Sequence, residues 1–115
     1  MNNTTRSVLD HAASILAKSF VEDVGHGHTT KAQCDALRTS KKCTSDVEFI
    51  KAALRHDRYQ VQAGLAMCGS KCNMRNVMKT SYQLNYLANE IVAKIRNSKR
   101  PEYVTARKTA LAGRS

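Results

Sequence analysis

The chain has 115 residues and a mass of 12.8 kDa, with 42% hydrophobic and 24% charged residues. This is the length of one domain and the composition of a globular protein, which excludes a mainly disordered chain. Its Lys and Arg residues outnumber Asp and Glu by 19 to 9, so the net charge is +10 and an anionic partner is expected.

The sequence predicts a protein with neither a secretory signal nor a membrane span. Residues 1–7 lack the charged-then-apolar layout of a signal peptide, and no apolar run approaches the ~20 residues of a membrane helix. We therefore expect an intracellular, cytoplasmic protein whose four cysteines are reduced thiols or metal ligands rather than disulfides. One proline and five glycines provide too few turns for a β-sandwich or barrel, which favours an all-α fold.

Apolar residues at helical spacing predict a small bundle of four to five helices. The first helix is expected over residues 5–24, with Thr4 or Thr5 as its cap. A short second helix should begin near Thr29 or Thr30, and Thr30 followed by Gln33 fits a capping box. Residues 39–43 are polar and are expected to form a loop.

The middle of the chain predicts two more helices. Ser45 followed by Glu48 fits a second capping box, and Asp57 can cap a further helix that ends at Gly69. The alternation of residues 59–63 would also suit a short strand, but no second strand-like segment exists to pair with it.

The longest helix is expected over residues 71–98 and is ended by Pro101. The chain would then divide into a helical domain, residues 1–98, and a basic C-terminal tail, residues 99–115. The apolar seam of this helix repeats at spacings near three and four and consists of Met74, Val77, Ser81, Leu84, Ala88, Ile91 and Ile95. The seam would suit either the core of the same chain or a homodimer, and polar Ser81 with small Ala88 favours the core.

Positive charge is concentrated in the last part of the chain. Residues 1–67 have a net charge of +2, whereas residues 68–115 have +8. Opposite the apolar seam, the long helix would carry a stripe formed by Arg75, Lys79, Tyr82, Tyr86, Asn89 and Arg96. The tail adds Lys99, Arg100, Arg107, Lys108 and Arg114.

Basic residues interleaved with tyrosines are typical of a nucleic-acid-binding surface, since cations contact phosphates and tyrosine rings stack on bases. The sequence therefore predicts a small nucleic-acid-binding regulator or accessory factor, and does not distinguish DNA from RNA. Alternatively, the stripe is an ordinary solvated surface. Another alternative is a helix-turn-helix, in which residues 57–68 form the first helix and the start of the long helix is the recognition end.

A further alternative is an interaction protein, of the small basic kind that viruses encode as inhibitors or assembly components. It would dock the same surface on an acidic protein partner.

Cys34, Cys43, Cys68 and Cys72 are candidate zinc ligands, with His26 and His28 as a second possible pair. Their spacing is not that of a usual zinc module, so buried thiols and loop histidines are the simpler interpretation. No glycine-rich phosphate loop, paired-carboxylate motif or His-Glu-x-x-His occurs, so we expect no enzyme and no cofactor.

Overall fold

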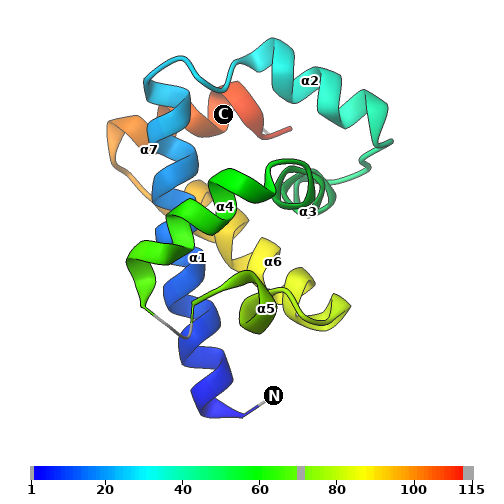
Figure 1. Ribbon diagram of the computed structural model, residues 1–115. Coiled ribbons are helices and arrows are strands. Elements are labelled where there is room, and N and C mark those ends of the chain that lie inside the picture. Colours follow the sequence, from blue (N-terminus) through cyan, green and yellow to red (C-terminus); the bar gives the residue numbers. More distant parts are fainter. Residues whose placement is uncertain (1, 70–71, 113–115) are drawn as a thin grey trace.

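The computed structural model describes residues 2–69 and 72–112, and only the backbone of Cys68. These residues form helices and no strand, which confirms the all-α prediction. The elements are α1 (Asn3–Gly25), α2 (Lys31–Ser40), α3 (Asp46–His56), α4 (Arg58–Leu65), the short 3-10 helix η1 (Ala66–Cys68), α5 (Met74–Val77), α6 (Ser81–Asn97) and α7 (Pro101–Ala110) (Figure 1).

Helix α1 forms the centre of the bundle and contacts α4, α6 and α7 (Figure 1). Helix α6 also packs on α3, and α2 packs on α3 and α7. At ~1.5 Å per residue, the 23 residues of α1 extend about 34 Å, close to the longest dimension of a molecule that measures 35 × 29 × 23 Å.

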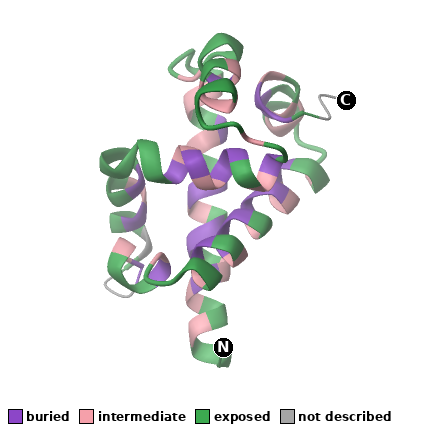
Figure 2. Cartoon of the chain, turned by 90° about the vertical axis from the view of Figure 1, so that its right-hand side faces the viewer, coloured by how far each residue is buried: buried purple, intermediate pink, exposed green. Residues whose placement is uncertain are grey.

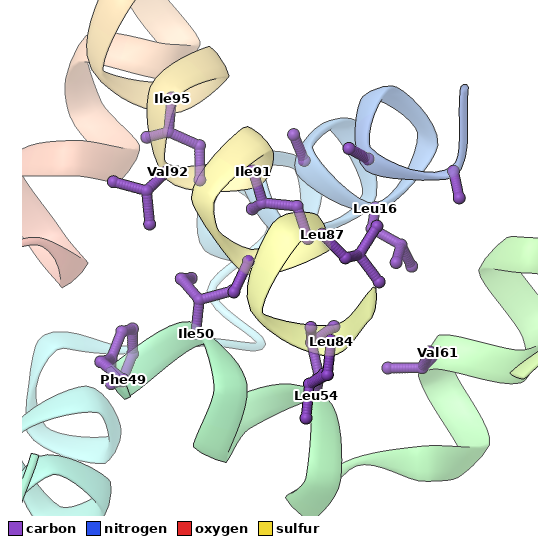
Figure 3. Packing of buried hydrophobic residues seen from close by; sticks show 14 of the residues in the cluster. Leu16, Phe49, Ile50, Leu54, Val61, Leu84, Leu87, Ile91, Val92 and Ile95 are labelled. Atoms are coloured by element: carbon purple, nitrogen blue, oxygen red, sulfur yellow. The ribbon is translucent and has the colours of Figure 1, made fainter. Parts of the chain in front are cut away.

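The core is built from the inner faces of these helices, where buried residues gather (Figure 2). Leu84, Leu87, Ile91 and Ile95 of α6 pack against α1 and α3 (Figure 3). Apart from exposed Ser81 and half-buried Met74, the apolar seam is therefore covered within the chain, as the core-packing interpretation predicted.

Most predicted helix starts agree with the structure. Thr30 and Gln33 form the expected capping box, Ser45 accepts a hydrogen bond from the Glu48 amide, and Asp57 accepts one from the Gln60 amide. Residues 59–63 are helical, so the strand interpretation was wrong. Helix α1 begins earlier than expected, because Asn2 rather than Thr4 or Thr5 caps it.

The prediction of one long helix over residues 71–98 was wrong. It is broken between α5 and α6, and residues 78–80 form the link. The cause is a capping box formed by Thr80 and Gln83. Thr80 accepts a hydrogen bond from the Gln83 amide, while the Gln83 side chain accepts one from the Thr80 amide. These bonds stabilise a helix start at Ser81.

Residues 101–112 do not form an appended arm, as the expected tail at 99–115 implied. Pro101 starts α7 instead of ending a helix, as suits a residue with no backbone N–H to pair. Ala106, Ala110 and Leu111 are buried, and α7 packs on α1, so this segment is part of the core.

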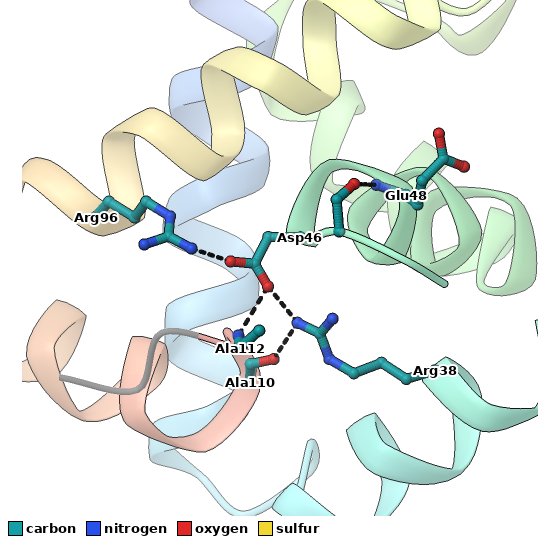
Figure 4. A network of polar contacts seen from close by, with 7 residues as sticks. Arg38, Asp46, Glu48, Arg96, Ala110 and Ala112 are labelled. Carbon is teal, nitrogen blue, oxygen red and sulfur yellow. Dashed lines mark hydrogen bonds and ion pairs between the residues drawn. The ribbon is translucent and has the colours of Figure 1, made fainter. Parts of the chain in front are cut away.

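A buried carboxylate joins four elements of the bundle (Figure 4). Asp46, at the start of α3, is 7% exposed. It forms ion pairs with Arg38 of α2 and Arg96 of α6, and it accepts a 2.8 Å hydrogen bond from the Ala112 amide beyond α7. Arg38 also donates to the Ala110 carbonyl at 2.8 Å.

Burial alone would raise the pKa of the Asp46 carboxyl. Hydrogen bonds from the Ala112 amide, Arg38 and Arg96, with the positive charge of Arg38, outweigh burial and hold the pKa below its ordinary value. The carboxylate is thus satisfied as an anion, which is the condition for a buried charge to be tolerated.

We expect Asp46→Asn to lower the free energy of unfolding by about 3 kcal/mol, because it leaves the largely buried Arg38 without its counterion. Urea unfolding measures this loss. Asp35→Asn is the matched control: its pair with Lys31 is exposed, and its removal should cost less than about 0.5 kcal/mol. Equal losses in the two variants would contradict the central role of Asp46.

The same carboxylate should make the fold sensitive to acid. Because its folded pKa lies below the ordinary value of 3.8, its contribution is present above about pH 4 and is lost as the pH falls through the folded pKa. Unfolding curves between pH 7 and pH 2 should therefore show a smaller loss of stability for Asp46→Asn than for the natural protein. Parallel curves for the two proteins would refute this assignment.

Candidate nucleic-acid interface

The break before α6 divides the predicted stripe. Arg75 lies in α5 and Lys79 in the link, whereas Tyr82, Asn89 and Arg96 lie in α6. The six residues consequently do not form one continuous helical row.

The polar residues of α6 differ in what they offer a ligand. The Tyr82 side chain is 66% exposed. The Tyr86 hydroxyl donates a 2.8 Å hydrogen bond to Asp10 Oδ1, which raises the pKa of the phenol. Asn89 is exposed and its side chain donates to the Asn85 carbonyl at 2.8 Å. Tyr82 is therefore the aromatic side chain of this set best placed to stack on a base.

Two of the predicted binding cations have structural contacts. Arg96 is half exposed and forms the ion pair with Asp46. Arg107 donates to the carbonyls of Ile95 and Ser98, at 3.1 and 2.8 Å, and so holds the end of α6 against α7. Their replacement would disturb the fold before it disturbed a binding surface.

The remaining cations of the predicted tail, Lys99, Arg100 and Lys108, are exposed. Arg114 lies outside the described residues. Lys99 and Arg100 follow the end of α6, about 25 Å along the axis from its first residue, at ~1.5 Å per residue. Arg75 and Lys79 thus lie near the start of α6 and Lys99 and Arg100 near its end, while Lys108 lies in α7.

At the start of α6 the structure brings distant cations together around a cavity of ≈ 500 Å³. Arg55 at the end of α3, Arg58 at the start of α4, Arg75 of α5 and Lys79 of the link all line it. We call this the cationic pocket. Its other lining residues are Met74, Met78, Thr80, Ser81 and Leu84.

The positive charge of the cationic pocket is not neutralised within the described part of the chain. None of its four cations has a carboxylate within the 4.0 Å limit of an ion pair there, and no acid is among its lining residues. Asp57, which stands between Arg55 and Arg58 in sequence, instead accepts from the Gln60 amide.

The start of α6 adds to this positive potential. The first N–H groups of a helix have no partner within it, and the helix dipole favours an anion there. The capping box uses the amide of Gln83, which leaves those of Ser81 and Tyr82 at the helix end. The cationic pocket therefore combines four side-chain charges with the N-terminus of a 17-residue helix.

Sequence reasoning missed Arg55 and Arg58. They lie in the half of the chain with nearly balanced charge, and the helical spacing of Arg75 and Lys79 points to neither. The local sequence Arg55-His56-Asp57-Arg58 gave one usable signal: a cation at the first position of a helix is unfavourable, and Arg58 stands there after the Asp57 cap.

The cysteines do not form the candidate zinc site. Cys72 is disulfide-bonded, so the expectation of reduced thiols was wrong for this residue, and a cysteine in that state supplies no thiolate to a metal. Cys34 and Cys43 carry reduced thiols, and the Cys68 side chain lies outside the described residues. Within residues 2–69 and 72–112, no three His, Cys, Asp or Glu side chains are grouped as metal ligands.

A second cavity, of ≈ 600 Å³, lies among α1, α2, α3 and α4 and shares no lining residue with the cationic pocket. Its lining is mostly apolar, with Asp23, His28, His56 and Asp57 among the polar residues. Burial raises the pKa of Asp23, while the neighbouring His28 opposes this shift. His28 also makes an edge contact with His26 at 6.0 Å between ring centroids.

Comparison with models of protein families, with curated proteins and with solved structures found no match. None of the helices in the described segments is long and apolar enough to cross a membrane.

Replacement of Arg58 by Gln should raise the free energy of unfolding by about 0.3–1 kcal/mol at low ionic strength. It removes a cation from a helix N-terminus and from the repulsion among the pocket cations. Urea unfolding at low and high salt measures the gain, which should shrink as salt screens the charges.

Lys31→Gln is the matched control, because Lys31 also occupies the first position of a helix. Its ion pair with Asp35 offsets the unfavourable position, so little change is expected. A loss of stability in Arg58→Gln would contradict the conclusion that the positive charges of the cationic pocket lack a neutralising carboxylate.

Proposed function

We propose that this protein binds nucleic acid and that the cationic pocket is its principal contact. The observation that carries the proposal is the convergence of Arg55, Arg58, Arg75 and Lys79 on one cavity without a lining carboxylate. Like charges held together repel one another, and a polyanion removes that cost on binding.

The types of residue in the pocket suit phosphate. Three of the four cations are arginines, whose planar forks make paired hydrogen bonds to phosphate oxygens. Thr80 and Ser81 bring hydroxyl groups and the helix end to the same place, and both are common phosphate contacts.

Lys99, Arg100 and Lys108 form the second part of the proposed contact. All three are exposed. Lys99 and Arg100 lie about 25 Å from the pocket along α6, comparable to roughly seven base-pair steps of duplex DNA, and Lys108 lies in α7. We propose a binding protein rather than an enzyme. We also propose that it acts inside the cell.

Titration with labelled DNA and RNA at several salt concentrations tests the proposal. We expect the logarithm of the association constant to fall with the logarithm of salt concentration with a slope of about −2 or steeper, as for three or more neutralised phosphates. Arg75→Glu with Lys79→Glu should abolish binding at a salt concentration where the natural protein binds.

Lys18→Glu with Lys41→Glu is the matched control, since both lysines are exposed and lie outside the pocket and the second part of the proposed contact. Arg96 is left intact because its ion pair with Asp46 stabilises the fold. No binding of any nucleic acid by the natural protein at low salt would end the proposal.

An acidic protein partner is the second candidate, and exposed apolar side chains favour it. Tyr59 is 82% exposed and Met67 is 84% exposed, and such residues are common at the centres of protein interfaces. Loss of a co-purifying protein in Arg75→Glu with Lys79→Glu, with unchanged nucleic-acid binding, would favour this candidate.

A further inference from the structure

The cationic pocket has two chemically different walls. Its cations come from α3, α4, α5 and the link before α6. Beside them Met74, Met78 and Leu84 supply an apolar wall. Met74 and Met78 are only half buried, so their side chains are within reach of a ligand.

This combination is more than a free inorganic phosphate or a carboxylate requires. A nucleotide presents a phosphate to the cations and the flat apolar face of a base to the methionines, which are flexible and polarisable and contact aromatic rings well. The cavity, at ≈ 500 Å³, falls within the ~300–1,000 Å³ typical of small-ligand sites.

The pairing state of the base follows from the same geometry. In a duplex the base faces are covered by stacking, and only the base edges and the backbone are accessible. A base can lie on the apolar wall only when it is unpaired and unstacked, as in single strands and loops.

We infer that the cationic pocket binds one nucleotide, with its phosphate at the start of α6 among Arg58, Arg75 and Lys79 and its unpaired base against Met74 and Met78. This deepens the proposed function and rests on it where the nucleotide belongs to a strand. A free nucleoside monophosphate offers the same chemistry, and the experiment separates the two sources.

Two exposed tyrosines fit a strand that continues out of the pocket. Tyr82 directly follows the pocket residue Ser81, and Tyr59 directly follows Arg58. Their side chains are 66% and 82% exposed. Neither tyrosine lines the pocket itself, but both rings are exposed enough to stack on bases of a strand that extends beyond it.

The experiment compares a short labelled single strand with a duplex of the same sequence, by fluorescence anisotropy at one low salt concentration. The natural protein is measured beside three variants. Arg58→Gln with Lys79→Gln removes two pocket charges, and Lys18→Gln with Lys41→Gln removes two exposed charges elsewhere. Met78→Gln keeps the length of the side chain but makes the apolar wall polar.

We expect the natural protein to bind the strand about tenfold more tightly than the duplex, as one stacked base can provide. Met78→Gln should weaken strand binding by about tenfold relative to duplex binding and so remove this preference. The pocket-charge variant should lose affinity for both and lose the preference, whereas the control should weaken both equally. A nucleoside monophosphate should displace the strand at concentrations where inorganic phosphate does not.

Equal affinity for strand and duplex, or displacement by inorganic phosphate as readily as by the nucleoside monophosphate, would overturn this inference and leave the proposed function standing. Binding of the nucleoside monophosphate without binding of strand or duplex would support the pocket ligand and overturn the proposed function. No binding of any of these ligands would overturn both. Unfolding midpoints of all variants establish that the compared proteins are folded.

Discussion

The structure depends on one satisfied buried charge, the carboxylate of Asp46. Its two arginine partners come from α2 and α6, and its amide donor follows α7, so a single side chain at the start of α3 holds four elements in register. A buried ion pair adds little net stability over well-packed apolar groups, but an unpaired charge there is costly. Asp46 therefore connects one point on each of four elements, while the apolar core supplies most of the stabilisation.

The packing of α3 on α6 also brings residues of both helices to the cationic pocket. Helices α3 and α6 pack on each other in opposite directions: Asp46 at the start of α3 binds Arg96 near the end of α6, and Arg55 at the end of α3 lies with Ser81 at the start of α6. Leu54 and Leu84 pack against each other at the end where Arg55 and Ser81 lie (Figure 3). The ion pair at one end and this apolar contact at the other thus hold α3 and α6 side by side.

The sequence was sufficient for whatever depends on local patterns. It predicted the all-α class, the Thr30, Ser45 and Asp57 caps and the apolar face of α6. It failed at the Thr80 cap, where an unbroken apolar repeat hid a helix start. It also failed at the pocket, since Arg55 and Arg75 are twenty positions apart and only the packing of α3, α4 and α5 brings them together.

The break before α6 connects these two failures. A continuous helix would have satisfied the amides of Ser81 and Tyr82 within itself and would have kept Lys79 on a helical row. The Thr80 capping box instead ends that continuity, exposes a helix N-terminus and turns Lys79 toward Arg58 and Arg75 around one cavity. A fold under selection for stability alone gains nothing from gathering four cations at such a point. The arrangement becomes favourable when an anion binds among the four cations. Binding of that anion would then stabilise the segments around the pocket, whose positive charges repel one another.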